Sequence, residues 1–195
     1  MKDIIKLGLI LLLVTAVAGA ALSLVNNVTK PRIEEQKRLV TERALIAALP
    51  DADKNYIEPV IKQDTLRYYI GYKDSTKQEI AGYAFIARKY GYSSEIQTMV
   101  GVDTLEKIIG LKIIQQVETP GLGTKIELIP YGESLSWAQK QIIDKTSDDL
   151  VVDKDGGQIA SITGATISSR AIVNSIKDGL EMLKKQLADS TMENE

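Results

Sequence analysis

A short stretch rich in small and hydroxyl-bearing side chains, residues 161–169 (SITGATISS), precedes a long amphipathic segment. If a helix begins there, its first backbone N–H groups lack intrahelical partners, and the aligned peptide dipoles leave partial positive charge. Helix starts of this kind bind phosphate, and the Thr166 hydroxyl would lie beside it. A hydroxyl at a helix start is also an ordinary N-cap, so this stretch alone leaves both interpretations open.

A second unusual stretch is residues 118–124 (ETPGLGT). Pro120 restricts φ, whereas Gly121 and Gly123 permit positive φ and the close approach of a ligand to the backbone. A Pro-Gly pair by itself marks only a turn. The stretch gains interest as a binding loop only in combination with the residues around Thr166.

The composition removes several kinds of chemistry, because the chain has no Cys and no His among its 195 residues. Thiolate catalysis, Ser-His-Asp triads, tetrahedral zinc sites, Cys-ligated iron–sulfur clusters and His-ligated haem are excluded. Any redox function would therefore need an organic cofactor. The net charge of −2 gives no electrostatic reason to expect nucleic acid as a partner.

Near the N-terminus, residues 7–25 form an apolar run without a charged residue. As a helix, about 19 residues span roughly 28 Å, close to the hydrocarbon thickness of about 30 Å. A cleaved signal peptide is the alternative, with Lys2 and Lys6 as its basic region and residues 18–20 (AGA) as its cleavage site. The apolar run continues beyond that site, which favours a retained anchor in the inner membrane. Flanking charges leave the topology open, and we expect the folded domain on the outer, periplasmic side.

Patterns after the apolar run predict an α+β fold. Pro31 suits a first helical position, which predicts a helix over residues 30–49. Alternating or Ile-rich segments predict neighbouring strands, and their short connections exclude crossover helices, so the sheet is expected to be largely antiparallel. The predicted strands are Leu66–Tyr72, Ile80–Arg88, Glu95–Val102 and Lys107–Val117.

The strongest helical pattern lies at the C-terminal end, directly after the Thr166 stretch. Apolar residues step by three and four along it, while charged residues occupy the other side. This pattern predicts a long helix with one apolar stripe against the sheet, followed by a polar, frayed tail over residues 189–195. The stripe comprises Val173, Ile176, Leu180, Leu183 and Leu187.

Three motifs occur in a fixed order behind the apolar run: Gly91-Tyr92, residues 118–123 (ETPGLG) and residues 163–166 (TGAT), with Ser168-Ser169 after the last. In these motifs the chain resembles the FMN-binding domain shared by two membrane redox proteins. These are the G subunit of the Rnf ferredoxin:NAD oxidoreductase and the C subunit of the sodium-pumping NADH:quinone reductase. The length favours the Rnf protein, because its quinone-reductase counterpart is usually longer.

The resemblance implies an electron-transfer subunit that carries FMN covalently, through a phosphoester to Thr166. A separate flavin transferase would form this bond from FAD, and the other subunits of the complex and the membrane would be the partners. Residues 118–124 would cover the flavin ring or ribityl chain. The further cofactor contacts expected are Glu118, Thr119, Gly121, Leu122, Gly123, Thr163, Gly164, Ala165, Ile167 and Ser168, with no catalytic residue and no metal ligand in the chain itself.

Together, the residue patterns and the resemblance predict a membrane anchor (1–28), a juxtamembrane helix (29–50), an FMN-binding domain (51–188, with its motifs within 91–187) and the tail. One position departs from the family pattern, since Ala160 stands where the attachment signal often has Asp. A membrane-anchored domain that binds flavin or another ligand without a covalent bond is therefore the alternative. Trp137, the only tryptophan, is expected to anchor a hydrophobic cluster rather than stack on flavin.

Overall fold

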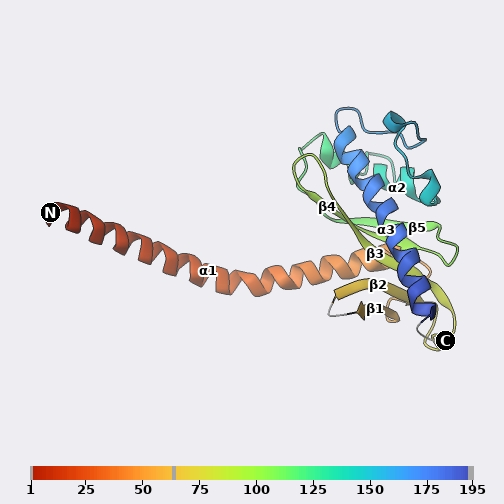
Figure 1. Ribbon diagram of the computed structural model, residues 1–195, viewed down its shortest axis with the longest axis horizontal. Coiled ribbons are helices and arrows are strands. Elements are labelled where there is room, and N and C mark those ends of the chain that lie inside the picture. Colours follow the sequence, from red (N-terminus) through yellow and green to blue (C-terminus); the bar gives the residue numbers. More distant parts are fainter. Residues whose placement is uncertain (1, 63–64, 193–195) are drawn as a thin grey trace. The chain divides into compact units, whose positions relative to one another are not determined.

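The computed structural model describes residues 2–62 and 65–192, and the chain divides into two compact units, one ending at Val40 and the other beginning at Thr41. The fold is α+β, as the sequence predicts. Its elements (Figure 1) are α1 (Lys2–Ala48), β1 (Ile57–Lys62), β2 (Thr65–Tyr72), β3 (Ile80–Tyr90), β4 (Glu95–Val102), β5 (Ile108–Gln115), η1 (Gly123–Ile126), α2 (Trp137–Ile142), η2 (Ser147–Asp149), η3 (Asp153–Asp155) and α3 (Thr166–Met192).

The first unit is the N-terminal part of α1, which contains a stretch long and apolar enough to cross a membrane. The apolar side chains of this stretch are not covered by other parts of the chain, as expected for a helix that faces lipid. The helix start predicted at Lys30 is wrong, because α1 runs without interruption from Lys2 to Ala48. Pro31 lies inside it, where the missing N–H removes one hydrogen bond without ending the helix.

The second unit is built on a five-stranded antiparallel sheet in which each strand pairs with the next along the chain. The four predicted strands correspond to β2, β3, β4 and β5. The sequence did not predict β1, which contains Pro59. Since β1 lies at the sheet edge, its proline needs no partner on the open side.

One face of the sheet carries α3, which crosses it in Figure 1. Val173, Ile176 and Leu180 of α3 are almost fully buried against Phe85 and Val100 of the sheet. The predicted apolar stripe is thus confirmed. The predicted tail begins inside α3, which continues to Met192, and residues 193–195 lie outside the described part of the chain.

The opposite face of the sheet receives the last turns of α1, so these turns belong to the folded domain. Ala44, Ala48 and Leu49 are buried there with Ala84 and Met99 of the sheet. The approach is close: a Cβ atom on Gly101 would come within 1.9 Å of the Ala48 carbonyl oxygen. Only glycine at this position lets the end of α1 lie on the sheet.

The segment between β5 and α3 contains the short helix α2, which the sequence analysis did not predict. Ser136 accepts a hydrogen bond from the Gln139 N–H, and the Gln139 side chain accepts one from the Ser136 N–H. This reciprocal capping box has a sequence signature, a Ser followed three residues later by Gln. The sequence therefore contained a recognisable signal for the start of α2.

Candidate functional site

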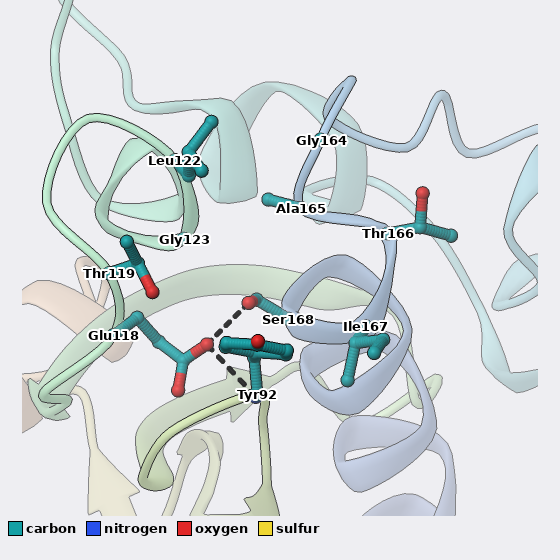
Figure 2. A pocket seen from close by; sticks show the side chains of 10 residues that line it. All are labelled: Tyr92, Glu118, Thr119, Leu122, Gly123, Gly164, Ala165, Thr166, Ile167 and Ser168. Atoms are coloured by element: carbon teal, nitrogen blue, oxygen red, sulfur yellow. Dashed lines mark hydrogen bonds between the residues drawn. The ribbon is translucent and has the colours of Figure 1, made fainter.

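A pocket of about 540 Å³ brings together the two stretches that the sequence analysis singled out (Figure 2). One wall is the loop after β5, and the other is the turn that leads into α3. A volume of this size suits a cofactor or another small molecule, for which pockets of about 300–1,000 Å³ are usual. The lining residues are Tyr92, Glu118, Thr119, Leu122, Gly123, Gly164, Ala165, Thr166, Ile167 and Ser168.

The loop after β5 is a compact turn fixed by its own hydrogen bonds. The Thr119 carbonyl accepts from the N–H groups of Leu122 (3.1 Å) and Thr124 (3.3 Å). The Gly121 N–H donates to the Thr124 hydroxyl at 3.0 Å, and Gly121 has a φ of 74°, the positive value that the sequence analysis allowed for. This geometry places the Leu122 side chain at the pocket, opposite the turn before α3.

The turn before α3 leaves several polar groups without partners. Gly164 adopts a φ of 80°, and the Ala165 N–H donates to the Ile162 carbonyl at 2.9 Å. Next in the chain, the N–H groups of Thr166, Ile167 and Ser168 open the helix and have no acceptor within the described residues. The Thr166 hydroxyl also has no partner there, and its side chain is half-buried. These donors point to an anionic ligand.

The backbone that enters this turn is held by side chains from elsewhere. Trp137 Nε1 donates to the Ala160 carbonyl at 2.9 Å, and the Ala160 N–H donates to the Gln141 side chain at 3.0 Å. The Ser161 N–H donates to Asp153 Oδ1 at 3.1 Å. Trp137 packs against the core and does not line the pocket, in agreement with the prediction for this residue.

Glu118 lies in the pocket wall with its carboxylate fully engaged by the protein, and only 3% of the residue is exposed. Its Oε1 accepts from the N–H groups of Ser93 (3.1 Å) and Ser94 (3.0 Å) and from the Ser94 hydroxyl (3.2 Å). Its Oε2 accepts from the Tyr92 N–H (3.0 Å) and the Ser168 hydroxyl (2.5 Å), as the dashed lines in Figure 2 show. Glu118 therefore connects three separate segments of the pocket.

The electrostatics of Glu118 follow from these contacts. Burial alone would raise the pKa of the carboxyl group, but the hydrogen bonds from the Ser168 hydroxyl and from the N–H groups of Tyr92, Ser93 and Ser94 outweigh it. Together they lower the pKa from 4.5 to about 2. The group is an anion at neutral pH.

Two glycines make room for the enclosed carboxylate. A Cβ atom on Gly123 would lie 2.6 Å from Glu118 Cβ and 3.0 Å from Ser168 Oγ. A Cβ atom on Gly91 would lie 2.7 Å from Glu118 Oε1. The glycines of two of the sequence motifs therefore serve the enclosure of Glu118.

Not every residue proposed from the sequence lines the pocket. Thr163 and Gly121 belong to the two loops but are exposed and lie outside the lining. Tyr92 lines it and was absent from the expected contacts, although the pair Gly91-Tyr92 was noted as a motif. The Tyr92 residue is 69% exposed, so its ring face is available to an aromatic ligand.

The donor set and the walls fit a phosphorylated aromatic cofactor. The free N–H groups at the start of α3 and the Thr166 hydroxyl suit a phosphate, and the apolar side chains of Leu122 and Ile167 with the Tyr92 ring suit a planar ring system. A bulky side chain in place of Gly164 would approach Leu122, since even a Cβ there would lie 3.2 Å from Leu122 Cδ2. The space between the walls thus depends on the small residue.

Comparison with known proteins gives the class. Residues 91–181 match the family described as the FMN-binding domain, a range that contains the whole pocket lining. Residues 1–47 match the family described as the RnfG N-terminal region, which covers the apolar part of α1. The fold and the pocket therefore define an FMN-binding domain behind an apolar N-terminal helix.

Relatives over nearly the full length identify the family. The chain is 33% identical to the G subunit of the ion-translocating oxidoreductase complex of Shewanella amazonensis, covering 96% of this chain and 92% of the relative. It is 31% identical to the G subunit of the Na(+)-translocating ferredoxin:NAD(+) oxidoreductase complex of Acetobacterium woodii, covering 93% and 92%. The chain belongs to the RnfG family, the G subunits of Rnf complexes.

Proposed function

We propose that this chain is an electron-transfer subunit that carries FMN as a phosphoester on Thr166. The observation that supports it best is the position of this hydroxyl: it stands at the start of α3, at the pocket edge, next to the unpaired N–H groups of Ile167 and Ser168. An esterified phosphate keeps a negative charge, which these N–H groups and the helix dipole would stabilise.

The remaining pocket residues would position the flavin. Gly164 and Ala165 keep bulk away from the phosphate, and Leu122, Ile167 and Tyr92 would exclude water from the ring. When bound, the flavin would supply the redox chemistry, since the chain has no Cys or His to hold a haem or an iron–sulfur cluster. The protein contributes orientation, burial and nearby charge.

The ester would form once, during maturation, with a flavin transferase as the catalyst. The Thr166 oxygen would form a bond to the phosphorus of the FMN part of FAD, and the pyrophosphate bond would break. AMP would leave, and the hydroxyl proton would pass to a base of the transferase. Ala160, in place of the usual Asp, has its backbone held by Trp137 and Gln141, so the approach to the turn is ordered without that carboxylate.

The partners in function would be the other subunits of the membrane complex, with the domain on the outer side of the inner membrane. Because the chain has no cysteine, a single exposed thiol tests this topology. In Lys185→Cys we expect labelling by a membrane-impermeant maleimide in intact spheroplasts. Labelling only after lysis would place the domain inside.

The experiment for the proposed function is the intact mass of the purified chain, expressed with and without an active flavin transferase. With the transferase, we expect the mass to increase by FMN less one water, and the denatured protein to fluoresce on a gel under ultraviolet light. Without it, the mass should be that of the chain. An unmodified chain beside an active transferase would contradict covalent attachment, and flavin released on denaturation would indicate non-covalent binding.

A further inference from the structure

Within the described part of the chain, no cationic side chain forms an ion pair with Glu118. Each of its hydrogen-bond donors is a neutral N–H or hydroxyl group. Neutral donors stabilise the anion but leave its net charge in place. The pocket wall therefore carries a full negative charge.

The same carboxylate joins segments that are distant in sequence. The turn between β3 and β4 provides the N–H groups of residues 92–94, the loop after β5 provides Glu118, and the first turn of α3 provides Ser168. These three segments also supply most of the pocket lining. The hydrogen bonds of this one side chain therefore tie the loop that carries Leu122 to the first turn of α3 and to the turn between β3 and β4.

We propose that Glu118 is a positioning residue that fixes the pocket walls and holds a negative charge beside the flavin, lowering the flavin's reduction potential. The inference rests on the proposed function. Reduction adds an electron within the pocket, and a fixed anion nearby opposes it by Coulomb repulsion. The buried location of Glu118 limits screening by solvent and salt.

The low pKa of Glu118 agrees with this role, because the carboxyl group stays ionised at every pH at which the complex would work. The Oε1 and Oε2 atoms already accept five hydrogen bonds of 3.2 Å or less. We infer that Glu118 acts on the flavin through its charge and through the walls it holds, not as a hydrogen-bond acceptor for it.

The test compares Glu118→Gln with Asp103→Asn in the full-length, flavin-labelled protein. Asp103 Oδ1 also accepts N–H groups in a strand-to-strand turn, from Leu105 (2.8 Å) and Lys107 (2.9 Å), but Asp103 does not line the pocket. Both variants lose one negative charge and keep the size of the side chain. Label is first quantified by intact mass, and the midpoint potential is then measured by redox titration at neutral pH.

We expect the potential of Glu118→Gln to shift to more positive values, while Asp103→Asn keeps the wild-type potential. Equal shifts in both variants, or no shift in Glu118→Gln, would overturn the inference. A wild-type chain that takes no label would instead overturn the proposed function, so the two failures are distinct.

Glu118→Asp keeps the test decisive if the Gln variant does not fold. It retains the charge and shortens the reach of the carboxylate by one methylene group, which weakens the hydrogen bonds from residues 92–94 and Ser168. We expect slower labelling by the transferase, with a potential in the labelled fraction close to that of the wild type. A clear positive shift in Glu118→Asp would show that the charge is not the cause.

Discussion

The two walls of the pocket differ in whether their polar groups are hydrogen-bonded by the protein. At Glu118, both carboxylate oxygens are buried and fully hydrogen-bonded by the protein itself. At Thr166, the hydroxyl and the neighbouring N–H groups have no partner among the described residues. The carboxylate wall is thus complete within the protein, whereas the donors of the Thr166 wall are left open to solvent or to a ligand.

Replacing Thr166 by Ala tests the Thr166 wall and has the largest expected effect. Because the proposed ester uses the Thr166 oxygen, Thr166→Ala should lose all covalent flavin in the presence of active transferase. The readout is intact mass together with in-gel fluorescence of the denatured chain.

Thr163→Ala is the matched control, because it removes a hydroxyl from the same turn that does not line the pocket. This variant should be labelled like the wild type. Full labelling of Thr166→Ala would show that Thr166 is not the attachment residue. Loss of label from Thr163→Ala would also contradict the assignment, because the control hydroxyl would then be required.

Lowering the pH tests the carboxylate wall. The folded-state pKa of Glu118, about 2, lies below its ordinary value of 4.5, so its contribution to stability is complete above about 4.5 and is lost as the pH falls towards about 2. The full contribution amounts to roughly 3 kcal/mol. Denaturant titrations of the unlabelled chain should show a steeper acid loss for the wild type than for Glu118→Gln. Parallel pH profiles for the wild type and Glu118→Gln would show that the hydrogen bonds to the Glu118 carboxylate do not stabilise the fold.

The smallest expected effect is at Thr98, an unsatisfied polar residue outside the lining of the candidate pocket. Its hydroxyl oxygen is buried in the core, with no hydrogen-bond partner within the described residues. Thr98→Val should raise the free energy of unfolding by about 1 kcal/mol, because the orphaned hydroxyl is a cost without a ligand to compensate it. A denaturant titration measures this, and a destabilised Thr98→Val would reveal a partner for the hydroxyl.

Much of the fold follows from local patterns. Residues 80–88 predicted β3 because two apolar sets alternate along them, one for each face, and both faces of β3 are buried, one beneath α3 and the other beneath the end of α1. The stripe on α3 was equally clear. The continuity of α1 could not be predicted, since Pro31 is as compatible with a helix start as with an interruption tolerated inside a helix.

The candidate site was predicted only where its residues are marked by local sequence patterns. Small residues and hydroxyls mark the Thr166 turn locally, so its residues could be named from the sequence. The role of Glu118 depends on donors that lie 24 to 50 residues away along the chain. No spacing rule connects such positions, and only the fold shows that the carboxylate is already occupied.

The most direct test of the central claim is fragmentation mass spectrometry of the tryptic peptide over residues 155–170 from chain matured with an active flavin transferase. This peptide holds Thr166 together with other hydroxyl residues of the turn, including Thr163 and Ser168. We predict one FMN less one water, with the fragment series placing it on Thr166. An unmodified peptide, or flavin on another hydroxyl of the same peptide, would contradict the account.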